Sequence, residues 1–485
     1  MRWTLVAALV LASASAFADA PVQQTLYINR CVGGCTVMGG ATDDASTHQS
    51  TIPCGGTVVQ MTGGFQCVNN VPKTYTVGEY QNNAGEIGAA ADAEFEQVME
   101  CVREVYSPYN VIVTDQKPTG GVPYTEGVLA GTPEDIGLSS QSTGGAAPAR
   151  LNNDCTAHGN VMSFSFANAT FWRGPDRVFT LCYVVAQETA HAYGLDHEYS
   201  FIDGTSSCRS PMTYRNDCGG QHFFRNQPAN CGEYANRPCN CGGLQDSHKK
   251  LLSVLGEGTP ITRPPTSTIL VPANGATITN GASVQASAGA QRGIARTELW
   301  LNGHNWAQAK GAAWGQNGQP DPSNYQMTLP AIVPDGVIDI VVKAYDDIEV
   351  ETDSSTVTVT KGAPCTTAAS CLEGQKCEAG KCFWDPPTGA LGDACTYNEF
   401  CVSGMCQDST AGQFCTQNCI IGSEGACPTM FDCVATSDTG GVCLPAGSSG
   451  SGCCSVGHES NGAVVARTGL GLLVFGLLLR RRRRH

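Results

Sequence analysis

The stretch Gln187–His197, QETAHAYGLDH, decides the fold of the N-terminal part of the chain. Positions 187 and 191 stand four residues apart, so on a helix both side chains lie on one face and can reach one ion. Glu188 would stand beside that ion, where a carboxylate can take a proton from a polarised water. Gly194 permits a sharp exit from the helix, which brings His197 back as a further ligand. The stretch therefore predicts a metal site with a carboxylate base.

The neighbouring segments support this interpretation. Val178–Ala190 is mostly apolar and contains no glycine or proline, which predicts a helix buried in the middle of a domain. Downstream, Ser210–Tyr214 reads SPMTY and places a methionine and a tyrosine shortly after the last candidate ligand. The alternative is a buried helix with two incidental histidines, which leaves the spacing and the SPMTY segment unexplained.

The spacing resembles the long zinc motif of the metzincin metalloproteases, H-E-x-x-H-x-x-G-x-x-H, except that Gln187 stands where the family has its first histidine. Ser210–Tyr214 is similar to the Met-turn that lies under the metal in that family. The resemblance covers about residues 25–255, but its specific residues lie within 187–214.

The resemblance implies a zinc-dependent endopeptidase that hydrolyses peptide bonds in a protein or peptide substrate. His191 and His197 would bind zinc, with Gln187 completing the ligand set, and Glu188 would act as general base. Met212 would support the site from below. Tyr214 falls where some branches of the family have an extra ligand or a group that stabilises the transition state.

Gln187 leaves three alternatives open. An amide oxygen is a harder and weaker zinc donor than a neutral imidazole. Gln187 binds weakly, with Tyr214 or water completing the ligand shell, or another residue such as His158 or Asp196 replaces it. Otherwise the domain holds no metal, and the chain is a non-catalytic adhesion or binding protein that keeps a metzincin scaffold.

The beginning of the chain and its cysteines indicate export. Residues 1–20 read as a secretory signal peptide, with an early arginine, a short apolar run and small residues near position 20. The chain has 26 cysteines, which predicts disulfide bonds in an oxidising compartment, at the cell surface, the outer membrane or outside the cell. The formal net charge is −15, and no basic patch precedes the C-terminal arginines, so nucleic acid is excluded as a partner.

Residues 21–255 are predicted to form one α+β domain of metzincin type. The expected strands and helix are Thr25–Ile28, Ala90–Val105 (helix), Asn110–Thr114 and Val161–Phe166. We expect Met162–Phe166 to be either an edge strand that pairs with an extended substrate or an ordinary core strand. The domain has twelve cysteines, which favour disulfides over the alternative of zinc-ribbon halves at Cys31/Cys35 and Cys239/Cys241.

A second domain follows a stiff linker. Residues 256–266 contain three prolines among Gly and Thr. Residues 267–361 then alternate strand formers with turn residues, which predicts an antiparallel β-sandwich similar to the Ig-like modules of bacterial surface proteins. We expect a spacer, with ligand binding as the alternative. The expected strands are Ser283–Ala288, Thr297–Leu301, Tyr325–Leu329, Val337–Ala344 and Ser355–Thr360.

Residues 363–447 hold another twelve cysteines and few large apolar residues, so they are predicted to fold as small disulfide-linked modules that act as a spacer or adhesive stalk. Residues 448–485 contain Cys453 and Cys454, the apolar run Thr468–Leu479, and five arginines at Arg480–Arg484. This order resembles the myxobacterial C-terminal sorting signal. The resemblance implies a transmembrane helix, a sorting protease in the membrane and modification of Cys453 or Cys454, with a plain membrane anchor as the alternative.

Overall fold

The structure is a computed structural model of the 485-residue chain. It describes residues 23–61, 64–138, 143–148, 156–215, 218–240, 242–311, 323–409, 411–421, 426–436 and 440–446. The chain divides into two compact units, the first up to Thr366 with Glu378–Cys382, and the second made of the rest. The signal peptide and the sorting tail, including Cys453 and Cys454, lie outside the described residues. In the described part of the chain, no helix is long and apolar enough to cross a membrane.

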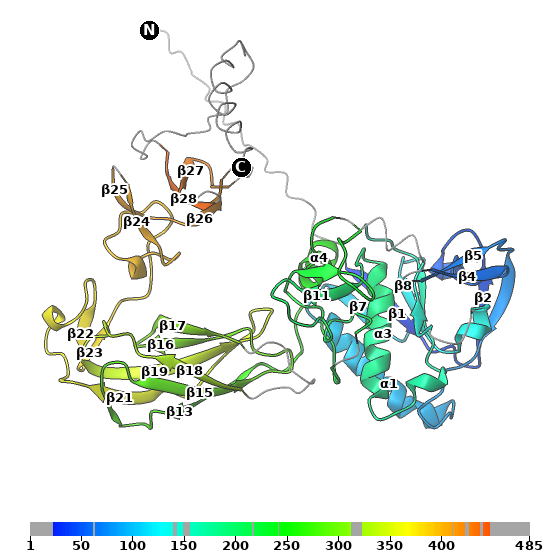
Figure 1. Cartoon of the computed structure of the whole chain (residues 1–485), viewed down its shortest axis with the longest axis horizontal. Coiled ribbons are helices and arrows are strands. Elements are labelled where there is room, and N and C mark those ends of the chain that lie inside the picture. Colours follow the sequence, from blue (N-terminus) through cyan, green and yellow to red (C-terminus); the bar gives the residue numbers. More distant parts are fainter. Residues whose placement is uncertain are drawn as a thin grey trace, which may run out of the picture. The chain divides into compact units, whose positions relative to one another are not determined.

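A five-stranded sheet forms the centre of the N-terminal domain (Figure 1). Its order is β7 (Val111–Thr114), β1 (Gln24–Asn29), β8 (Thr125–Leu129), β10 (Met162–Ser165) and β9 (Gly145–Ala146). The first four strands are parallel, and β9 pairs antiparallel with β10. The strands expected at β1, β7 and β10 are confirmed.

Of the two alternatives for Met162–Phe166, the core strand is confirmed and the edge strand is wrong. Strand β10 lies between β8 and β9, and all four of its residues are buried. The edge on this side is Gly145–Ala146, a two-residue strand among small residues. Such a short run carries too few strand-forming side chains to be recognised from the sequence.

Two helices cover one face of the sheet, α1 (Ala89–Tyr106) and α3 (Arg177–His191). Both confirm the helices expected from the sequence. Their apolar side chains pack with those of β1 in one core, and a disulfide joins Cys101 of α1 to Cys182 of α3. Helix α3 approaches β8 closely, because a Cβ at Gly127 would lie 2.9 Å from Cγ2 of Thr189. This contact allows the C-terminal end of α3 to pack closely on the sheet.

The opposite face of the sheet is covered by small strands. They are β2 (Cys35–Gly39), β3 (Gln49–Ser50) and β6 (Lys73–Val77) in one sheet, and β4 (Thr57–Met61) and β5 (Gly64–Val68) in another. Short 3-10 helices are η1 (Ala45–Thr47), η2 (Pro133–Ile136) and η3 (Thr170–Trp172). Disulfides Cys31–Cys35 and Cys54–Cys67 close this region. Cys31 and Cys35 are therefore not zinc-ribbon ligands.

The chain after α3 returns across the end of the domain. Strand β11 (Glu198–Phe201) pairs antiparallel with β12 (Ala229–Cys231), and helix α4 (Ser247–Leu255) closes the domain. A disulfide joins Cys231 to Cys239, which also removes Cys239 from the zinc-ribbon alternative. Cys241 lies outside the described residues.

The second domain is a β-sandwich, as expected. One sheet has the order β13 (Thr266–Val271), β15 (Ser283–Gly289), β18 (Ser323–Thr328). The other has β14 (Thr277–Ile278), β21 (Val357–Lys361), β19 (Gly336–Tyr345), β16 (Arg296–Leu301) and β17 (His304–Lys310), with β20 (Glu351–Asp353) beside β19. The five expected strands are present. Strand β17 was not expected, because its HNWAQAK sequence is mostly polar.

The cysteine-rich segment consists of short hairpins held by disulfides. Its elements are η4 (Ala368–Ser370), β22 (Lys376–Glu378), β23 (Lys381–Phe383), η5 (Asn398–Phe400), β24 (Cys406–Ser409), β25 (Gly412–Cys415), β26 (Asn418–Ile420), β27 (Phe431–Ala435) and β28 (Gly440–Pro445). All twelve cysteines of this segment are disulfide-bonded. Four bridges are Cys395–Cys406, Cys401–Cys415, Cys419–Cys433 and Cys427–Cys443. So many disulfides indicate an exported protein.

Candidate metal centre

The end of helix α3 positions the candidate ligands. The helix ends at His191, and the chain turns at Gly194, whose φ of +80° lies in the left-handed region that favours glycine. The N–H of Gly194 donates to the carbonyl of His191 at 3.0 Å. Three residues later His197 lies opposite His191, as the spacing in the sequence predicted.

The two imidazoles meet through their Nε2 atoms, which are 3.2 Å apart. On His191, Nδ1 lies 2.7 Å from the carbonyl oxygen of Leu195, and on His197, Nδ1 lies 3.1 Å from Oε1 of Glu233. Carbonyl and carboxylate oxygens only accept, so each Nδ1 carries the hydrogen. When both imidazoles are neutral, both Nε2 atoms then carry lone pairs that face each other.

This arrangement fits a bound zinc ion. Two facing lone pairs repel each other unless a cation or a proton lies between them. Two nitrogens that each lie at the usual zinc distance, with tetrahedral geometry, are about 3.3 Å apart. Burial and the neighbouring His197 lower the pKa of His191 to about 3, so this imidazole stays neutral, which is the form that binds metal. The residues present therefore fit the ion that the spacing implies.

Gln187 lies one helical turn before His191 and is only 4% exposed. Its Nε2 atom has no hydrogen-bond partner among the described residues. A buried polar group without a partner costs about 1–3 kcal/mol. Amide oxygen and nitrogen exchange places by a flip of the side chain, so an oxygen can occupy this position and donate a lone pair. An amide nitrogen without a hydrogen-bond partner is compatible with a ligand role for Gln187.

Glu188 is buried against the edge strand. A Cβ at Gly145 of β9 would lie 2.5 Å from Cγ and 2.6 Å from Oε1 of Glu188, so the carboxylate packs directly on the backbone of that strand. Burial raises the pKa of Glu188 to about 8. The carboxylate therefore lies where the end of α3 and the edge of the sheet come together.

The SPMTY segment runs next to the histidines. Met212 is fully buried in the core, and its carbonyl accepts a 2.6 Å hydrogen bond from the N–H of Glu198, the residue after His197. The ring of Tyr214 lies 4.5 Å from the ring of His197 and is 41% exposed. Partial burial and the nearby Glu188 raise the pKa of Tyr214, so its hydroxyl remains a hydrogen-bond donor.

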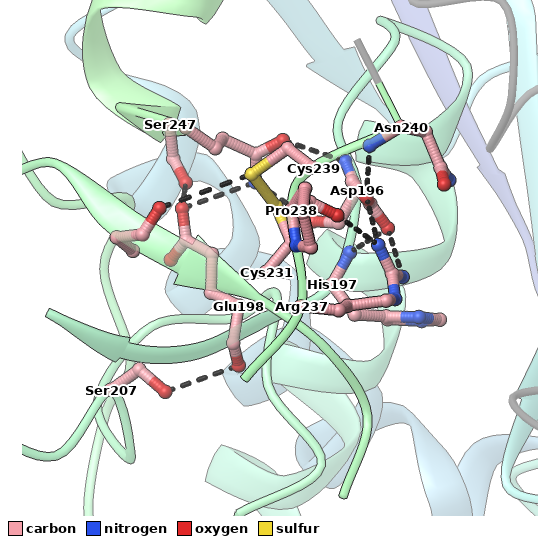
Figure 2. Close-up of a disulfide and its surroundings, with 12 residues drawn as sticks. Asp196, His197, Glu198, Ser207, Cys231, Arg237, Pro238, Cys239, Asn240 and Ser247 are labelled. Atoms are coloured by element: carbon pink, nitrogen blue, oxygen red, sulfur yellow. Dashed lines mark hydrogen bonds and ion pairs between the residues drawn. A yellow bond between two sulfur atoms is a disulfide. The ribbon is translucent and has the colours of Figure 1, made fainter. Parts of the chain in front are cut away.

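Asp196 and His158, the two alternative ligands considered from the sequence, form hydrogen bonds with other residues. Both carboxylate oxygens of Asp196 accept 2.7 Å hydrogen bonds from Arg237, and Oδ2 also accepts the N–H of Asn240 (Figure 2). His158 donates its backbone N–H to the carbonyl of Ala192, and its Nε2 lies 3.1 Å from Oγ1 of Thr156. The contacts thus favour Gln187 over either residue as the additional ligand.

Sequence reasoning missed two residues of the site, Glu233 and Arg237. Arg237 binds Glu233 at 2.7 Å and Asp196 at 2.7 Å, so one guanidinium joins the two carboxylates that flank His197. Hydrogen bonds from His197 and Arg237 hold the pKa of Glu233 well below its usual range. Cys231 and Cys239 enclose the loop that carries Glu233 and Arg237, and they were the only sequence feature close to both residues. Their spacing does not show that this loop contacts His197.

No family model and no curated protein match the chain. Among solved structures, fibronectin(III)-like modules of Clostridium thermocellum CbhA match at 21% identity and a TM-score of 0.17, over 21% of this chain and 48% of that one. An endo-beta-1,4-mannanase from Thermotoga petrophila matches at 14% identity and a TM-score of 0.16, over 24% of this chain and 23% of that one. A Jonesia denitrificans lytic polysaccharide monooxygenase matches at 16% identity and a TM-score of 0.15, over 19% and 60%. The chain thus spans about half or less of the length of the first two. Likenesses this weak carry no argument about fold or function.

Proposed function

We propose that the chain is an exported zinc-dependent peptidase of metzincin type, delivered to the cell surface. The observation that carries the proposal is the pair of Nε2 atoms 3.2 Å apart, each with its Nδ1 held by an acceptor. Two buried imidazoles that present lone pairs to each other need a cation or a proton between them, and a zinc ion at its usual distance from two nitrogens fits this gap. The Ig-like sandwich and the cysteine-rich segment would act as a spacer, and the C-terminal tail as the signal for a sorting protease in the membrane.

Each residue of the site would have a separate role in peptide hydrolysis. His191, His197 and Gln187 would hold the zinc ion, which as a Lewis acid makes water nucleophilic near neutral pH. The charge of the zinc ion would favour the ionised form of Glu188, which would take the proton of the attacking water and pass it to the leaving amine. The hydroxyl of Tyr214 would donate a hydrogen bond to the oxyanion that develops on the peptide carbonyl. Met212 packs beneath the site and makes no contact with the substrate.

The edge strand β9 gives the substrate a place to bind. Among the described residues its one sheet partner is β10, so we infer that the opposite edge can pair with an extended peptide. Glu188 packs against Gly145 of this strand, so a peptide paired there would pass close to the general base. We therefore infer a protein or peptide substrate bound in extended form.

The proposal is tested with Glu188→Ala in the full-length chain. Loss of a general base should lower kcat/KM for peptide hydrolysis by about 10²–10⁴-fold, while zinc binding persists. Glu100→Ala is the matched control, because Glu100 lies exposed on α1. Peptidase activity that survives Glu188→Ala unchanged would contradict the mechanism.

A second candidate function is a non-catalytic surface adhesion or binding protein. It is favoured by Gln187, because an amide is a weak zinc donor. Gln187→His separates the two functions. If the natural chain is a peptidase, the variant binds zinc more tightly and both forms hydrolyse peptides. If hydrolysis appears only in Gln187→His, the natural chain is a binding protein.

A further inference from the structure

The nine-residue segment Cys231–Cys239 forms a loop that lies against the segment that carries His197. Strand β12 enters the loop paired with β11, and the N–H of Gly232 donates to the carbonyl of His197 at 3.0 Å. Gly232 has a φ of +140°, and a Cβ there would overlap the carbonyl oxygen of Ala235. The disulfide closes the loop at its other end. The loop therefore has little freedom to move away from His197.

Arg237 fixes the loop on the opposite side. Its Nη1 and Nη2 atoms each donate to the carboxylate of Asp196 at 2.7 Å, and Nη2 also donates to Oε1 of Glu233 at 2.7 Å. Asp196 itself accepts the backbone N–H of His197 at 2.7 Å. One guanidinium thus holds Glu233 in line with the imidazole that it contacts. Figure 2 shows Arg237 with its hydrogen bonds to Asp196.

The position of Glu233 has a chemical consequence for His197. Its Oε1 accepts from Nδ1, which excludes the tautomer with the hydrogen on Nε2 and directs the Nε2 lone pair at His191. A carboxylate that accepts from Nδ1 also makes Nε2 a stronger metal ligand than a neutral carbonyl at the same place does. His191 has only the carbonyl of Leu195 in the corresponding place.

We propose that Glu233 is a positioning residue of the metal centre, and that its carboxylate compensates for the weak amide donor at Gln187. The inference rests on the proposed function, because it assigns Glu233 a role in holding the zinc ion. Arg237 and the Cys231–Cys239 bridge serve the same end by fixing the carboxylate. Removing such a partner of a metal-binding histidine typically weakens metal affinity about 10–100-fold.

The first measurement is the zinc dissociation constant of the full-length chain, obtained by competition with a chelator. Glu233→Ala should weaken zinc binding about 10–100-fold. Glu233→Gln should recover part of the loss, since its amide oxygen still accepts from Nδ1 but carries no charge. Glu100→Ala, on the exposed face of α1, should bind as the natural chain does. Equal affinity in all four proteins overturns the positioning role.

The second measurement needs no zinc. In metal-free chain labelled with ¹⁵N-histidine, long-range nitrogen–proton spectra report the tautomer of His197, assigned with a His197→Asn variant. We expect the hydrogen on Nδ1 in the natural chain and in Glu233→Gln, and a mixture of tautomers in Glu233→Ala. An unchanged tautomer in Glu233→Ala overturns the inference. If the natural chain binds no zinc, the proposed function fails instead, whatever the tautomer shows.

Discussion

Gln187 and Glu233 are the residues on which the chemistry of the site depends. The side chain at position 187 would supply a weak donor to the proposed zinc ion. The side chain at position 233 reaches His197 from a loop 36 residues downstream. Position 187 follows from helical periodicity, because residues four apart share a face. Glu233 does not, because only the closed loop brings it to the imidazole. Local spacing thus predicted the two histidines but not the group that orients one of them.

Gly145 offers a test at the scale of one residue. Gly145→Ala places a methyl group 2.5 Å from Cγ of Glu188, so Glu188, the proposed general base, must move. We expect kcat/KM for peptide hydrolysis to fall by at least about tenfold, consistent with the cost of misplacing a reacting group. Zinc affinity should be unchanged, because neither histidine is touched.

The matched control is Gly159→Ala, where a Cβ has open space. Both variants are assayed for hydrolysis and for zinc affinity. Full activity in Gly145→Ala would show that Glu188 does not act from its position beside β9.

Helix α3 is the element that joins the core to the site. Its apolar side chains are buried against α1 and the sheet, and its last residue is His191. The sequence predicted its extent well, because the run from Val178 is apolar and free of helix breakers. The strand β9 that lies over Glu188 was missed, because pairing with β10 rather than propensity makes it a strand.

The packing beside α3 predicts how stability depends on pH. His222 stacks on Tyr183 of α3 with ring centroids 4.5 Å apart, and burial lowers its pKa from 6.5 to about 4. As the pH falls, His222 is therefore protonated in the unfolded chain at a higher pH than in the folded chain. This contribution to stability is complete above about pH 6.5 and is lost as the pH approaches 4, at roughly 1.4 kcal/mol per unit.

The measurement is the free energy of unfolding by denaturant between pH 7 and pH 4, a window that contains both values of the His222 pKa. His222→Asn should flatten the dependence. His248, whose pKa burial also lowers to about 4, supplies a remaining part of the slope, so the double variant with His248→Asn should be flatter still. If the free energy of unfolding changes with pH equally in His222→Asn and in the natural chain, His222 does not cause this loss of stability.

At the scale of the whole molecule, the first unit joins the N-terminal domain to the sandwich through buried charges. Asp347 binds Arg292 at 2.9 Å and Arg225 at 3.0 Å, and all three side chains are nearly inaccessible to solvent. Arg292 also donates to the carbonyl of Phe224 at 2.8 Å. The proline-rich linker in the sequence predicted two domains, but it gave no sign that these three residues meet across the junction.

Asp347→Asn tests this junction. The change leaves two buried guanidinium groups with less compensating charge, so we expect a loss of about 3–5 kcal/mol in the free energy of unfolding. Glu96→Gln is the matched control, because its ion pair with Arg103 lies at the surface of α1 and is worth about 0–1 kcal/mol. Similar losses from both variants would show that the junction does not stabilise the molecule.

The central claim is that the two facing imidazoles bind zinc. It is tested most directly by elemental analysis of the full-length oxidised chain, purified without added zinc, alongside His191→Ala. We expect close to one zinc per natural chain and none retained by the variant, since a tetrahedral site needs both imidazoles when its third donor is an amide. A folded natural chain without zinc would contradict zinc binding by His191 and His197. It would favour the second candidate function, a non-catalytic surface binding protein.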